Sequence, residues 1–193
     1  MKYEEIEKIV KQTLSEKRYI HSCGVAKRAV ELAKIYGQDQ EKAKIIGIAH
    51  DIAKEMPKQE ALNYAKENGI EFDEIEKLEP GLWHSKLGAD IAKKKFGFTD
   101  DMAQAILYHT TANINMNTMD KIIYIADKTE EGRTIIDLSI AIDISNKDLD
   151  EGVLYISKFA MEYSLKKDSL IHPDTVNIIN RIITKKRNIN DII

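Results

Sequence analysis

Six histidine and aspartate residues, spread over the first two thirds of the chain, have the chemistry to bind divalent metal ions. Imidazole and carboxylate groups are ligands of borderline and hard cations, and four of the five histidines of the chain belong to this series. Six such groups are more than one ion needs from a protein if it also keeps positions for water and substrate. The pattern favours a metal-dependent hydrolase, with two ions as one form of the site. In chain order the residues are His21, His50, Asp51, His84, His109 and Asp127.

The adjacent pair His50-Asp51 is the centre of this series because of the apolar residues before it. The run IIGIAH puts His50 at the end of an apolar helical segment, so we expect that helix end to pack in the core. A buried, charged Asp51 is costly unless a metal ion, hydrogen bonds or another cation compensate it. Its two carboxylate oxygens could bridge two ions.

Asp127 is expected to point inward for a similar reason. It follows the apolar run IIYIA, and Tyr124 and Ile123 precede it by one helical turn. A carboxylate on that face needs a partner. The alternative to a metal ion is an ion pair with Lys128 or Arg133.

His84 and His109 lie at ends of predicted helices, where a histidine can also cap backbone carbonyls. Each one taken separately is therefore ambiguous, and only their occurrence with the other candidates favours metal binding. His172 immediately precedes Pro173 in a predicted turn, and we interpret it as a structural or lining residue.

The composition is that of an ordinary soluble domain. At 193 residues the chain can form one domain with a full hydrophobic core, and 43% of its residues are hydrophobic and 32% charged. A net charge of -3 gives no indication of an extended nucleic-acid-binding surface. A phosphate-bearing substrate would have to be met by local cations and metal.

Cysteine content and the N-terminal residues favour a reducing, cytoplasmic location. The single cysteine, Cys23, cannot form an intrachain disulfide. The start, MKYEEIEKIV, has no apolar stretch typical of a signal peptide. No apolar run approaches the roughly 20 residues that cross a bilayer, so no membrane partner is expected.

The spacing of apolar residues predicts helices throughout and no strand. We expect one all-α domain, a helical bundle over residues 1–193, with the metal-site core at about 17–135 and C-terminal helices at about 147–187. The predicted helices are an N-terminal one through Leu14, then 21–36, 40–50, 57–69, 82–96, 99–109, 117–129, 147–168 and 174–187.

The order of one His, a His-Asp pair, two further His and a final Asp resembles the HD-domain phosphohydrolase superfamily. The flanking residues are closer still to its YqeK branch, the symmetrical diadenosine tetraphosphate hydrolases, over about residues 17–181. The segments that carry the resemblance are KRYIHSCGVAKRA, AHDIAKEMP, LWHSKLGA, ILYHTTANINMNTMDKIIYIADKTEEGR and LIHPDTVNIINRI.

This resemblance implies an all-helical HD fold with a di-iron centre, in which Asp51 bridges the two ions. Without thiolate ligands, iron or manganese is at least as plausible as zinc. By position, the metal ligands would be His21, His50, Asp51, His84, His109 and Asp127. The catalytic residues would be Asp51, Lys54 and Arg133, and the substrate-binding residues Arg18, Lys54, Thr110, Thr111 and Arg133.

The implied reaction is symmetrical hydrolysis of a dinucleoside polyphosphate, so that diadenosine tetraphosphate and water give two ADP by attack of a metal-bound hydroxide. Two hypotheses stay open beside it: hydrolysis of nucleoside monophosphates or other phosphate esters, and a non-catalytic nucleotide-binding module. The implied partners are the nucleotide substrate and its product, and a homodimer is left open.

The chain departs from the family pattern at two positions near the expected substrate. Ala112 stands where the family usually has glycine after HTT, and Glu131-Gly132 stands where it tends to have proline. Both departures lie in predicted loops and leave the six candidate ligands intact. They bear on how the nucleotide is held.

Overall fold

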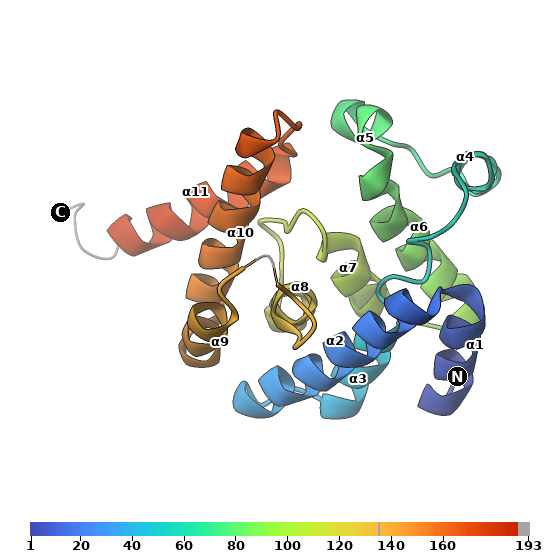
Figure 1. Cartoon of the computed structure of the whole chain (residues 1–193), viewed down its shortest axis with the longest axis horizontal. Helices are drawn as coiled ribbons and strands as arrows, with labels where there is room; N and C mark the ends of the chain where they lie inside the picture. The colour runs from blue at the N-terminus through green and yellow to red at the C-terminus, as the bar shows by residue number, and fades with distance from the viewer. Residues whose placement is uncertain (135, 189–193) are drawn as a thin grey trace.

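The computed structural model describes residues 1–134 and 136–188, and within these residues it contains helices and no strand. The predicted all-α class is therefore confirmed (Figure 1). A 3-10 turn, Pro80–Leu82, and a π-helical turn, Ala92–Phe96, flank α6. The α-helices are α1 Tyr3–Thr13, α2 Glu16–Ile35, α3 Gln40–Ala49, α4 Lys58–Glu67, α5 Glu74–Leu78, α6 Trp83–Ile91, α7 Asp100–Tyr108, α8 Thr118–Thr129, α9 Leu138–Lys147, α10 Leu149–Lys166 and α11 Pro173–Asn188.

Helix α8 occupies the middle of the bundle and contacts α2, α3, α7, α9 and α10 (Figure 1). Its residues 122–127 are all buried, because the apolar run faces neighbours on every side. The helix begins with a capping box, in which Asn117 accepts a hydrogen bond from the Asp120 backbone and Asp120 accepts one from the Asn117 backbone. These contacts fix the start of the helix that carries Asp127.

Helices α2 and α3 pack closely along each other, and small residues allow this. A Cβ atom on Gly47 would lie 2.7 Å from the Cα of Ala26. The turn between the helices contains Gly37 at a φ of 63°, as expected, and Asp39 caps α3 by accepting a hydrogen bond from the Lys42 backbone. The backbone of α3 therefore approaches α2 directly.

The predicted start of α2 at His21 was more than one turn too late. The helix begins at Glu16, and Ser15 is its N-cap. Glu55 accepts hydrogen bonds from the Ser15 backbone (2.6 Å) and hydroxyl (2.7 Å). This contact joins residues far apart in sequence, so local spacing did not reveal it.

Helix α9 was not predicted. Its leucine and isoleucines alternate with other residues from Leu138 to Ile144, so no stripe of helical period is visible. In the structure its buried residues are Ala141 and Ser145, one turn apart, and Asp137 caps it. The two following helices, α10 and α11, lie where they were expected.

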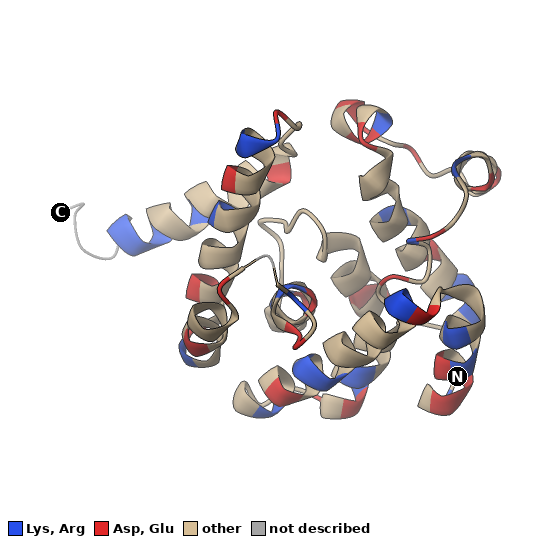
Figure 2. Cartoon of the chain, in the orientation of Figure 1, with Lys and Arg blue, Asp and Glu red and all other residues tan. Residues whose placement is uncertain are grey.

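Positively and negatively charged residues are distributed along most of the helices (Figure 2). The last turn of α11 carries three basic residues, Lys185, Lys186 and Arg187. Among the described helices, none is long and apolar enough to span a membrane.

The close approach of α2 and α3 leads to a stability prediction. We expect Gly47→Ala to lower the free energy of unfolding by about 1–3 kcal/mol, because its Cβ meets backbone atoms that cannot move away. Gly81→Ala is the matched control, since a Cβ there has no atom within 4 Å. Urea unfolding measures both, and equal stability of the two variants would contradict this account of the packing.

Candidate metal centre

The structure brings the six candidate ligands together although five different helices or their ends supply them. His21 lies in α2 and Asp127 in α8, whereas the other four lie at or just beyond a helix end. Five of the six residues are buried, with exposed fractions of 4% or less, and the side chain of His21 is 11% exposed. The terminal positions are the C-cap of α3 for His50, the next turn for Asp51, the first turn of α6 for His84 and the C-cap of α7 for His109.

The carboxylate of Asp51 lies in the middle, with imidazoles on both sides. Its Oδ2 atom is 3.7 Å from His21 Nε2 and 3.4 Å from His50 Nε2. Its Oδ1 atom is 3.3 Å from His84 Nε2 and 3.6 Å from His109 Nε2. The two oxygens therefore face two separate pairs of histidines.

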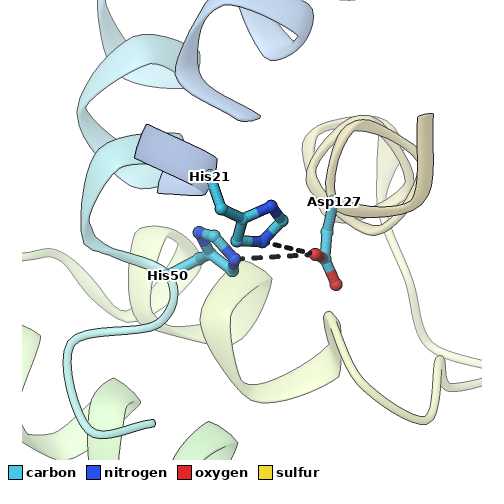
Figure 3. Close-up of side chains that lie close together, drawn as sticks. All are labelled: His21, His50 and Asp127. Atoms are coloured by element: carbon cyan, nitrogen blue, oxygen red, sulfur yellow. Dashed lines mark ion pairs between the residues drawn. The ribbon is translucent and has the colours of Figure 1, made fainter. Parts of the chain in front are cut away.

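Asp127 completes the cluster on one side only. Its Oδ1 atom is 3.0 Å from His21 Nε2 and 3.7 Å from His50 Nε2 (Figure 3). His21, His50 and Asp127 form one group able to hold a cation, and His50, Asp51 and His109 form another. The two groups share His50 and lie next to each other.

All four histidines have the same orientation: Nδ1 faces an oxygen acceptor and Nε2 faces the centre. An imidazole that donates through Nδ1 keeps its lone pair on Nε2. This is how metal-binding histidines are usually held. The Nδ1 acceptors are the Glu130 carboxylate for His21 (3.1 Å), Gly47 O for His50 (2.7 Å), Gly81 O for His84 (2.8 Å) and Ile106 O for His109 (2.6 Å).

On the far side of Asp51, the Nε2 atoms of His84 and His109 face each other. His84 Nε2 and His109 Nε2 are 3.1 Å apart. The Thr110 hydroxyl lies 3.2 Å from each, and the Lys54 ammonium lies 3.4 Å from His84 Nε2. Burial lowers the pKa of both imidazoles, so a second proton on either ring is disfavoured. Two neutral imidazoles whose Nε2 atoms face each other could bind one cation between them.

On the near side, the charges favour a cation at Nε2 of His50. Burial opposes protonation of His50, but the carboxylates of Asp51 and Asp127 outweigh it and raise its pKa to about 9. Burial likewise opposes ionisation of Asp51 and Asp127. The pKa of Asp51 is nevertheless held well below its ordinary range by the surrounding histidines, His50 first, and that of Asp127 by Lys128, His21 and His50. His50 Nε2 is buried and has no hydrogen-bond partner among the described residues. A metal ion fits that position.

Four cationic side chains surround the cluster. Arg18 donates to Asp51 Oδ2 over 2.9 Å, and both Lys128 and Arg133 form ion pairs with Asp127. Lys54 donates to the Gly81 carbonyl over 3.3 Å and lies beside His84. Burial lowers the pKa of Lys54. Among the residues predicted to meet substrate, Arg18, Lys54, Thr110 and Arg133 thus lie at the cluster.

Thr111, the fifth residue predicted to bind substrate, makes no hydrogen bond with the six candidate ligands among the described residues. Its hydroxyl donates to the Ala112 carbonyl over 3.2 Å.

Asp127 forms ion pairs with both Lys128 and Arg133, which were the alternative to a metal ion, and it also faces the imidazoles of His21 and His50. The two interpretations of Asp127 are therefore compatible.

Glu130 is a residue that the sequence did not single out. It is 6% exposed, accepts from His21 Nδ1, and also accepts from the Gly132 backbone over 2.7 Å. A Cβ on Gly24 would lie 2.5 Å from its carboxylate, so the glycine leaves the space that Glu130 fills. In the sequence, the one feature that could have indicated Glu130 is its place three positions, or about one helical turn, after Asp127.

A further group of potential ligands, Asp73, Glu76 and His172, lies away from this centre. Asp73 caps α5 and faces His172 Nε2 over 2.8 Å, while Glu76 pairs with Lys86. Each acid therefore already has partners, and the arrangement joins α5 to the turn before α11.

The comparisons with known proteins agree with this fold and cluster. Residues 18–132 match the HD domain family. The chain therefore belongs to the HD-domain family.

Two relatives share the name bis(5'-nucleosyl)-tetraphosphatase, symmetrical. The protein from Bacillus subtilis is 34% identical over 95% of this chain and 99% of its own length. The protein from Halalkalibacterium halodurans is 33% identical over 93% of this chain and 96% of its own length. A Clostridium acetobutylicum crystal structure, described as a predicted HD superfamily hydrolase involved in NAD metabolism, superimposes with a TM-score of 0.91 at 34% identity, over 96% of this chain and 98% of that one.

The contact between Glu130 and His21 leads to a prediction about metal affinity. We expect Glu130→Ala to weaken metal binding by about 10–100-fold, because the imidazole loses the acceptor that orients it. Glu131→Ala is the matched control, since that carboxylate is 82% exposed and pairs with Lys27 at the surface. Competition with a chelator measures both affinities, and equal values would show that Glu130 does not position His21.

Proposed function

We propose that this protein is a metal-dependent hydrolase that cleaves diadenosine tetraphosphate symmetrically into two ADP. The observation that carries the proposal is the convergence of four Nε2 atoms on two buried carboxylates, with cationic side chains around them. The names of relatives that match over more than nine tenths of the chain support the substrate. Metal ions held by such ligands, with phosphate-binding cations beside them, could polarise a phosphoryl group and activate water for hydrolysis of an acid anhydride.

Two ions, with iron as the expected metal, would share Asp51. His21, His50 and Asp127 would complete the ligands of one ion, and His84 and His109 those of the second. Such ions polarise phosphoryl oxygens and lower the pKa of water at neutral pH. The functional core would then span about residues 17–135, close to the matched segment 18–132, in a cytoplasmic protein.

The chain's own side chains would hold the polyphosphate and offset its charge. Arg18 and Arg133 have guanidinium groups that match phosphate oxygens in pairs, and Lys54 and Lys128 add point charges. In the structure Arg18, Arg133 and Lys128 pair with the same carboxylates that would bind metal. When the carboxylates bind metal ions, these cations can turn to an anionic substrate.

The two alternative hypotheses lack an observation of equal weight. A non-catalytic module would not need six ligands in place, and all six converge. Hydrolysis of nucleoside monophosphates would use the same cluster, but the named relatives act on a dinucleoside tetraphosphate. The products of the reaction distinguish the two hydrolases.

The test is a product assay with diadenosine tetraphosphate and added iron or manganese. We expect ADP as the sole nucleotide product, whereas AMP plus ATP would overturn the symmetrical reaction. Asp51→Asn should lower kcat/KM by at least about 10³-fold together with metal content, because several kcal/mol of charge stabilisation are lost with the metal. Asp143→Asn, which removes an exposed carboxylate that pairs with Lys147 at the surface, should leave both unchanged.

A second prediction separates substrate binding from metal binding. We expect Lys54→Ala to lower kcat/KM by about 10–100-fold while metal content stays constant, because the ammonium group meets phosphate and ligates nothing. Lys66→Ala is the control, since that side chain is exposed on α4. Steady-state kinetics gives kcat/KM and elemental analysis gives the metal content of each variant. Loss of metal from Lys54→Ala would contradict this role and show that Lys54 is needed to hold the metal.

A further inference from the structure

Two cavities lie on either side of helix α10 and share one wall. Ala160 and Ser164, one helical turn apart, line both cavities. The first, here cavity A, has a volume of about 260 Å³, and the second, cavity B, has about 220 Å³. Pockets that enclose a whole drug-sized ligand have roughly 300–1,000 Å³. Each cavity therefore fits one end of a dinucleotide and neither fits all of it.

Cavity A is suited to a nucleobase. Ile156, Phe159 and Tyr163 of α10 give it an apolar and aromatic wall, and Ile136 closes it from the loop after α8. Aromatic side chains bind bases by stacking. Tyr163 is 46% exposed, so its ring is available to a ligand.

Cavity B has a different chemistry. The hydroxyl groups of Thr110, Thr111, Ser169 and Thr175 lie in its walls beside apolar side chains, those of Leu82, Met161, Leu170 and Ile171. The Thr175 hydroxyl donates to the Thr111 carbonyl over 2.9 Å, which ties α11 to the loop after α7. Such a cavity can take a nucleoside through hydrogen bonds as well as apolar contact.

Each cavity adjoins a different end of the metal centre. Lys128 and Arg133 line cavity A and pair with Asp127. Thr110 and Gly81 line cavity B and contact His84, the hydroxyl over 3.2 Å at Nε2 and the carbonyl over 2.8 Å at Nδ1. A chain of phosphates across the centre would thus have one cavity beyond each end.

We propose that cavities A and B are two unlike subsites for the two nucleosides of the substrate, and that together they set the position of the cut. This proposal rests on the proposed function. With both nucleosides seated, the middle of the phosphate chain lies at the metal centre, and the bond cleaved leaves two phosphates on each product. The symmetry of the reaction then follows from two end contacts and not from a symmetrical site.

The test truncates one exposed side chain in each cavity. Tyr163→Ala affects cavity A and Leu170→Ala affects cavity B, and Leu165→Ala is the control, a 60% exposed side chain of α10 that lines neither cavity. We expect each cavity variant to raise the KM for diadenosine tetraphosphate at least about threefold with little change in kcat, and the control to match the wild type. Adenosine tetraphosphate, with one nucleoside, should respond to only one of the two cavity variants.

The outcomes separate the two proposals. A wild-type protein that does not convert diadenosine tetraphosphate to ADP overturns the proposed function and the subsites with it. Normal conversion with an unchanged KM in either cavity variant overturns the subsites alone. Equal increases in KM for both substrates in both variants would also overturn them, because that pattern indicates a general disturbance. Melting temperatures check that the variants fold.

Discussion

One buried carboxylate, that of Asp51, sets the conditions that the rest of the structure has to meet. It is 2% exposed and lies between two pairs of imidazoles. An unpaired charge at this depth would destabilise the fold by several kcal/mol. The carboxylate therefore needs positive charge or hydrogen-bond donors close to both of its oxygens. Arg18 supplies one cation, and the positions of the histidine lone pairs favour metal ions as the others. Three helix ends, those that carry His50, His84 and His109, thus converge around this carboxylate.

The surrounding helices fix the ligands through backbone groups as much as through side chains. Three of the four imidazoles face a carbonyl three residues earlier, and each of these histidines lies at the end or the start of its helix. His21 lies inside α2, where the carbonyls are already used, so its Nδ1 needs a side chain, and Glu130 provides it. The position of each histidine along its helix therefore decides what kind of group orients it.

The sequence predicted those parts of the fold and site that depend on local pattern. The apolar runs before His50 and Asp127 indicated buried acids, and Gly37, Asp39 and Gly97 marked helix ends that the structure contains. Glu130 and the start of α2 depend on contacts between distant residues, so no local spacing revealed them. Helix α9 was missed because its apolar residues alternate, while its position comes from packing of Ala141 and Ser145.

The two departures from the family pattern change how the loops are held and leave the ligands where they are. Ala112 has a φ of 59°, in the left-handed region where glycine is favoured, and its full burial and a hydrogen bond to Tyr108 hold it there. The other loop lacks proline, but the Gly132 backbone donates to Glu130, and a Cβ at Gly132 would lie 3.0 Å from that carboxylate. Glycine therefore leaves room for Glu130 against His21, and the loop is held by the same acid that contacts this candidate ligand.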